Sequence, residues 1–149
     1  MPINATIPIT IAASPEQVWP WVSDIEKHPQ WSPKSYTVEL VSGQADAVGA
    51  KYRSVGWVPG DSHHGNDVTI TESVPFTRFA LTAEDSSGVF TNSYDLKPVA
   101  GGTEVTFHIE FPELKGAAKF MAPIAFPIVG TPDIKKRLKL LKAKAESKS

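Results

Sequence analysis

The feature that most constrains this chain is a long run of alternating apolar and polar residues, interrupted only by short turn signals. Apolar side chains recur at every second position in 36–40, 68–70, 79–83, 90–96 and 105–111, with Asn92 as the one polar exception. A period of two residues is typical of a strand with one buried face. Because short turns such as Gly101-Gly102 join these segments, the sequence predicts an antiparallel meander.

The segment before the meander predicts an edge strand and two short helices. Residues 4–12 alternate in the same way, and Pro8 within them favours a strand with a free edge or a bulge. Ser14-Pro15-Glu16-Gln17 is typical of a helix start, with Ser14 as the capping residue. We expect a short helix to Asp24 and a second short helix or turn over 25–30.

The last part of the chain changes period and predicts a helix. Ile134, Leu138, Leu141 and Ala145 recur at helical spacing and form one apolar stripe. Residues 133–149 carry seven Lys or Arg and two acidic residues, whereas the rest carries eight and fourteen. Since the aromatic residues lie in the acidic part, away from the basic tail, we expect no nucleic-acid partner.

Length and composition exclude several classes of protein. The 149 residues predict a single domain, 1–149, with residues 146–149 as a tail. The absence of cysteine excludes thiol catalysis and disulfides. No signal-peptide pattern is visible, and the apolar stretch 117–129 is too short to span a membrane, so we expect a cytoplasmic protein without membrane insertion.

No sequence pattern indicates a metal or a cofactor. His63 and His64 are adjacent in a predicted turn between two strands, over residues 61–67. Adjacent side chains on extended backbone point apart, so two coordinating nitrogens do not converge easily. The phosphate-binding, dinucleotide-binding and metalloprotease motifs do not occur. We therefore expect no metal site and no cofactor, and the sequence leaves the oligomeric state open.

The order of elements resembles the START-like superfamily, also called SRPBCC, which includes polyketide cyclase/dehydrase and lipid-transport type proteins. The resemblance is carried by the segment 11–24, by Trp31-Ser32-Pro33 and by the hairpin 98–103. It implies an α+β helix-grip fold: a strongly curved seven-stranded antiparallel sheet, two short helices and a long C-terminal helix that enclose a cavity. One departure is that Pro123, Pro127 and Pro132 should interrupt the C-terminal helix.

Alternation predicts which side chains face such a cavity, for which we expect a volume of at least about 300 Å³. Strand 51–58 is ambiguous, and we favour Tyr52 on the inside because the alternative would bring in Lys51 and Arg53. Each polar group on this face is as well explained by core packing as by ligand contact. The expected ligand-binding residues on the strands and before them are Trp31, Tyr36, Tyr52, Phe79, Phe90, Asn92, Tyr94 and Phe107.

The apolar segment 117–129 is expected either to pack in the core or to close the cavity as a lid. In the second interpretation Phe120, Met121, Ile124 and Phe126 also contact the ligand, and Gly130 with the prolines permits movement. Core packing is the simpler of the two interpretations.

The favoured function is binding or carriage of a hydrophobic small molecule such as a lipid, a polyketide or an aromatic metabolite. The alternative is a polyketide cyclase/dehydratase-type enzyme acting in the same cavity. We expect no catalytic residue, because the inward strand positions hold no Asp, His, Lys or Arg, and Glu72 is the one carboxylate near them. A third hypothesis is a protein-interaction module that uses the basic helix.

Overall fold

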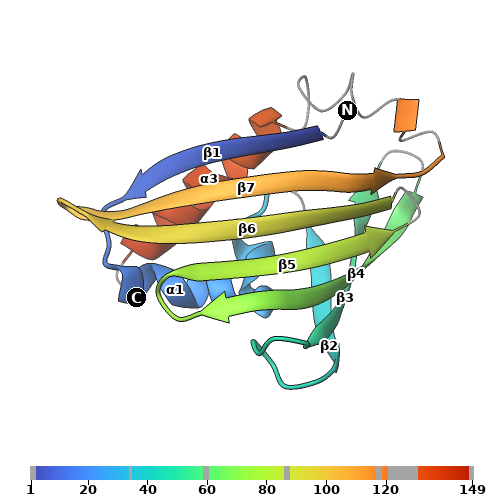
Figure 1. Cartoon of the computed structure of the whole chain (residues 1–149), viewed down its shortest axis with the longest axis horizontal. Helices are drawn as coiled ribbons and strands as arrows, with labels where there is room; N and C mark the ends of the chain where they lie inside the picture. The colour runs from blue at the N-terminus through green and yellow to red at the C-terminus, as the bar shows by residue number, and fades with distance from the viewer. Residues whose placement is uncertain are drawn as a thin grey trace.

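The computed structural model describes residues 3–33, 35–58, 61–85, 88–116, 119–120 and 131–147. Its centre is a seven-stranded sheet in the order β1-β7-β6-β5-β4-β3-β2, in which every neighbouring pair is antiparallel (Figure 1). The strands are β1 (Ile3–Ile11), β2 (Tyr36–Ser42), β3 (Lys51–Val58), β4 (Asp61–Val74), β5 (Arg78–Asp85), β6 (Gly88–Val99) and β7 (Gly102–Leu114). The predicted α+β helix-grip fold is confirmed.

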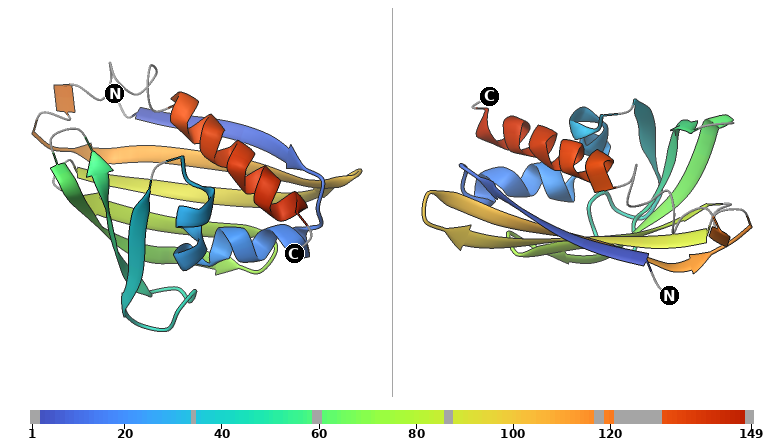
Figure 2. Two further views of the ribbon diagram at one scale, coloured as in Figure 1. Left: turned by 180° about the vertical axis from the view of Figure 1, so that it is seen from behind. Right: turned by 90° about the horizontal axis from the view of Figure 1, so that it is seen from above.

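The helices lie on one side of this sheet, and β2, β3 and β4 curve up toward them (Figure 2). They are the α-helix α1 (Pro15–Ser23), the 3-10 helix η1 (Ile25–Trp31) and the C-terminal α-helix α3 (Thr131–Glu146). The predicted stripe of Ile134, Leu138, Leu141 and Ala145 is the buried face of α3. The curved sheet and the helices therefore enclose the core between them. No helix in the described part of the chain is long and apolar enough to cross a membrane.

Backbone pairing explains how the alternation becomes a curved sheet. A turn of two residues joins β6 to β7, where Val99 pairs with Gly102 and Gly101 adopts a φ of 84°. This left-handed conformation is accessible to glycine without strain. β1 is an edge strand that pairs only with β7, so the missing N–H of Pro8 is tolerated there.

β4 is longer than the sequence indicates. The segment 61–67 was expected to be a turn, but it is extended and pairs with β3, with Gly56 opposite His64 and Val55 opposite Gly65. The prediction was wrong because these residues are polar or glycine and give no alternation, whereas the backbone hydrogen bonds to β3 do not depend on side-chain type.

The start of α1 is capped as predicted. The Ser14 side chain accepts a hydrogen bond from the Gln17 backbone N–H (3.2 Å), and the Gln17 side-chain oxygen accepts one from the Ser14 N–H (3.1 Å). These bonds satisfy two donors that a helix start otherwise leaves without partners. The helix continues through Pro20 and ends at Ser23, close to the expected end.

We expect Ser14→Ala to lower the free energy of unfolding by about 0.5–2 kcal/mol. The Gln17 N–H loses its side-chain acceptor and keeps only the Ser14 carbonyl oxygen, at 3.0 Å. Urea denaturation followed by circular dichroism measures the change. Ser14→Asp is the matched control, because its carboxylate can accept the same bond and should preserve stability. Equal stability of Ser14→Ala and the unaltered protein would show that the cap does not contribute.

Candidate functional site

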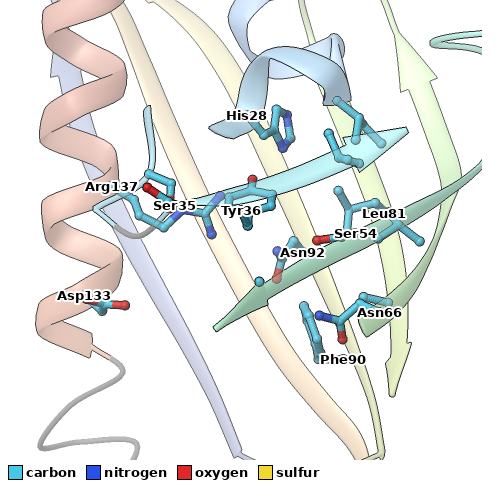
Figure 3. Close-up of a pocket in the computed structure, with 16 residues that line it drawn as sticks. His28, Ser35, Tyr36, Ser54, Asn66, Leu81, Phe90, Asn92, Asp133 and Arg137 are labelled. Atoms are coloured by element: carbon cyan, nitrogen blue, oxygen red, sulfur yellow. The ribbon is translucent and has the colours of Figure 1, made fainter. Parts of the chain in front are cut away.

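A cavity of about 260 Å³ lies between the concave face of the sheet and α3 (Figure 3). Apolar side chains from β2, β4, β5 and β6 form most of its wall: Val38, Val68, Leu81, Ala83 and Phe90. Tyr36, Ser54, Asn66 and Asn92 add polar groups from the same sheet, and α3 contributes Asp133 and Arg137. The volume is smaller than the 300 Å³ or more that we expected from the sequence.

Strand β3 turns its Tyr52 side inward, as favoured, and Ser54 and Gly56 of the same face line the cavity. Tyr52 itself is almost fully buried, and its hydroxyl accepts a hydrogen bond from the Asp46 N–H at 2.9 Å. It thereby fixes the loop between β2 and β3. Its position indicates a structural role at the edge of the cavity.

The expected ligand-binding residues occupy three different environments. Tyr36, Phe90 and Asn92 line the cavity. The larger group is buried in the core and is not among the described lining residues: Trp31, Tyr52, Phe79, Tyr94 and Phe107. Phe120 is 75% exposed, while Met121, Ile124 and Phe126, and with them most of the expected lid 117–129, lie outside the described residues. Ligand contact by any of these residues stays a prediction.

Arg137 reaches from α3 into a buried cluster of rings. Its guanidinium carbon lies 5.1 Å from the centre of the Trp31 ring, and it donates a hydrogen bond to the Tyr94 hydroxyl. Trp31 is completely buried, and its Nε1–H donates to the Trp21 carbonyl oxygen at 3.0 Å. This cation–π contact with a ring whose own position is fixed holds the guanidinium at the cavity.

His28 is a second buried polar residue at this end of the cavity. Its Nε2–H donates to the Val22 carbonyl oxygen at 2.7 Å, and its ring centre lies 4.8 Å from that of Trp31. Burial lowers the pKa of His28 to about 3, and the charge of Arg137 also lowers it, against the opposing effect of the Val22 bond. The imidazole is therefore neutral at physiological pH.

The two tyrosines near Arg137 are also neutral. Burial raises the pKa of Tyr36 to about 12, and it raises the pKa of the fully buried Tyr94 as well, against the opposing charge of Arg137. Among the described lining residues, Arg137 is then the one basic side chain that is charged at neutral pH, and Asp133 is the one carboxyl side chain. The electrostatic field in the cavity depends on these two.

Three side-chain atoms at this cavity are buried without a hydrogen-bond partner among the described residues. They are Oδ1 of Asn66, Oδ1 of Asn92 and Nε of Arg137. In the part of the chain that the structure describes, these are all the buried side-chain nitrogen and oxygen atoms of this kind, and all three residues line the same cavity. Buried polar groups are nearly always paired, so such a concentration indicates a place where another molecule supplies the partners.

The described strand residues that line the cavity include no Asp, His, Lys or Arg, as expected, but the helices bring such side chains to it. Alternation identifies the inward positions of strands but says nothing about helices, and Asp133, Arg137 and His28 all come from helices. A usable signal existed for Arg137, which follows Ile134 by three residues and precedes Leu141 by four. Such spacing places it at the margin of the buried stripe. Glu72, in contrast, is half exposed and forms an ion pair with Arg78 at 2.5 Å.

No group of three or more His, Cys, Asp or Glu side chains in the described ranges is placed to hold a metal ion. The side chains of His63 and His64 lie outside the described residues. For these reasons the absence of a metal site, like the absence of a cofactor, stays a prediction.

The sequence matches the family model described as polyketide cyclase / dehydrase and lipid transport over residues 2–146. The chain belongs to this family. This member of the polyketide cyclase / dehydrase and lipid transport family also shares its fold with solved structures. A comparison with curated protein sequences finds no significant match.

Three solved structures illustrate the shared fold. The protein CV1439 from Chromobacterium violaceum is 20% identical, with a TM-score of 0.74 and coverage of 98% of this chain and 99% of that one. Ara h 8.0201 is 15% identical, with a TM-score of 0.76 over 99% and 100% of the two chains. The di-domain ARO/CYC StfQ from the steffimycin biosynthetic pathway is 14% identical, with a TM-score of 0.79 over 98% and 51%. At these identities the likeness shows the fold alone.

Proposed function

We propose that the protein binds and carries a small, mainly apolar molecule in the cavity between the sheet and α3. The observation that carries this proposal is the cavity itself, which has apolar walls from several strands and a few buried polar groups. Sites for small molecules typically combine these features. The family description, which names lipid transport beside cyclase and dehydrase activities, supports the same class of function.

A cyclase or dehydratase reaction in this cavity is the alternative, and the same family description favours it. General acid–base catalysis needs a group that can exchange a proton near neutral pH. His28 and Tyr36 line the cavity, but their pKa values of about 3 and about 12 lie far from neutrality. Carriage is therefore the better-supported proposal, and turnover of a polyketide-type substrate would favour the alternative.

Blocking the cavity tests the proposal. Val38 lines the cavity and is half-buried, whereas its neighbour Glu39 points to the opposite face and is exposed. We expect Val38→Trp to weaken binding of the neutral fluorescent probe N-phenyl-1-naphthylamine about tenfold or more, because the indole occupies the space the probe needs. Fluorescence titration measures the affinity.

Glu39→Trp is the matched control, since it adds the same indole to the same strand outside the cavity and should leave the affinity unchanged. Failure of the unaltered protein to bind the probe would contradict the proposal, as would equal affinities for the protein and Val38→Trp. Native mass spectrometry of protein purified from its own host would then show whether a small molecule is retained.

A further inference from the structure

We infer that the ligand carries an ionised oxygen group that Arg137 binds through Nε, and a hydroxyl group that donates to Oδ1 of Asn92. The inference rests on the proposed function, because it places the ligand in the same cavity, and it names the chemical class that this cavity selects. The class is a ring compound with an acidic group, such as a carboxylate, at one end and a hydroxyl at the other.

The acidic group follows from the state of Arg137. Its guanidinium is held against the Trp31 ring at 5.1 Å and bonded to the Tyr94 hydroxyl, yet its Nε is buried without a partner. An unpaired donor on a buried cation is costly, and an anionic oxygen is the acceptor that satisfies it best. In Figure 3 the guanidinium extends from α3 toward Tyr36, so an acceptor that enters the cavity can reach this end.

The side chains around Arg137 do not provide a negatively charged partner for its guanidinium, so we assign that partner to the ligand. His28 and the hydroxyls of Tyr36 and Tyr94 are neutral at physiological pH, and so none of them supplies a negative charge. Asp133 lies one turn earlier on α3, near the helix start, where the helix dipole favours a carboxylate. Figure 3 shows it nearer than Arg137 to the start of α3. The negative charge of Asp133 opposes an anion in the cavity, which makes Arg137 the attractive end.

The hydroxyl follows from Asn92. This residue lies on β6 and is only 6% exposed, and its unpartnered Oδ1 is an acceptor. An acceptor in this position repels a carboxylate and attracts a donor such as a hydroxyl. Oδ1 of Asn66, on β4, is a further unpartnered acceptor at the same cavity. Phe90, Leu81 and Val68 provide the apolar wall for the ring that joins the two polar groups.

Three naphthalene probes test the inference: 6-hydroxy-2-naphthoate, 2-naphthoate and methyl 2-naphthoate. They share one ring system, so differences in affinity report the acidic group and the hydroxyl separately. At pH 7 we expect 2-naphthoate to bind about 10- to 100-fold tighter than its methyl ester, as for a hydrogen bond to a charged group. The added hydroxyl should tighten binding a further 2- to 10-fold, or about the effect of a neutral hydrogen bond.

Variants assign these effects to residues. Arg137→Met keeps an unbranched side chain over Trp31, and it should abolish the preference for the acid over the ester while leaving ester affinity intact. Lys136→Met is the matched control, because it removes the same charge from an exposed position on the same helix. Asn92→Leu should abolish the gain from the hydroxyl alone. Calorimetric titration measures all the affinities.

The outcomes separate the inference from the proposed function. Equal binding of acid and ester by the unaltered protein would overturn the inference while still supporting an apolar cavity. Loss of the acid preference in Lys136→Met to the same extent as in Arg137→Met would also overturn it, because long-range charge would then suffice. If none of the three probes binds, the proposed function fails as well. Should Arg137→Met not fold, the comparison of acid and ester on the unaltered protein decides.

Discussion

Replacing Trp31 with alanine is expected to lower the free energy of unfolding by about 3–5 kcal/mol. The indole is completely buried and lies beside His28, Tyr94 and Arg137, with ring centres 4.8 Å and 6.0 Å away for the first two. Alanine would leave a cavity under α3, and the Trp21 carbonyl oxygen would lose its donor. Both effects act on the native state, where neighbouring side chains can collapse only partly into the space.

Urea denaturation of Trp31→Ala, followed by circular dichroism, should show a lower midpoint with an unchanged slope. Trp31→Phe keeps most of the buried ring area and should lose much less stability. Trp21→Ala removes an indole that is only partly buried and should also have a smaller effect. A loss below about 1 kcal/mol for Trp31→Ala would mean that the ring does not pack as the structure shows, since burying such a side chain is worth more than that.

The strands could be predicted because their signal is local. Ile11, Val68, Ile70 and Val105 fall at every second position within their strands, and all four are buried. The first half of β4 could not be predicted in this way. Residues 61–67 are extended because they pair with β3. This pairing depends on the register of the β3–β4 hairpin, which is a property of both segments together and not of residues 61–67 alone.

Alternation predicts the face of a strand but not the depth at which a side chain lies. Phe79 and Phe90 both point to the concave face, yet Phe79 lies 6.3 Å from the Trp19 ring of α1 and is fully buried, while Phe90 lines the cavity. The difference depends on where α1, η1 and α3 cover the sheet. This placement is a tertiary property. Alternation therefore predicted Tyr36, Phe90 and Asn92 as cavity-facing residues, but it predicted core residues such as Phe79 in the same way and could not distinguish the two groups.

Acid is expected to lower the free energy of unfolding through the titration of His28. The pKa of His28 is about 3 in the folded protein and about 6.5 when the chain is unfolded. Above pH 6.5 the imidazole is neutral in both states, so its titration has no effect on stability there. Between pH 6.5 and 3 the unfolded chain binds a proton that the folded protein does not, and stability falls by about 1.4 kcal/mol per pH unit.

The free energy of unfolding should therefore drop by roughly 4 kcal/mol between pH 6.5 and pH 3.5 through this one residue. His28→Gln isolates the effect, because the glutamine amide can still donate to the Val22 carbonyl oxygen but does not titrate. We expect the variant to lose this part of the acid slope, as measured by urea denaturation at a series of pH values. His108→Gln, which removes a partly exposed imidazole that bonds to Thr6, is the matched control for replacing a histidine elsewhere in the protein. Parallel pH curves for the protein and His28→Gln would show that the buried imidazole is protonated in the folded state, because only a group with different folded and unfolded pKa values couples stability to pH.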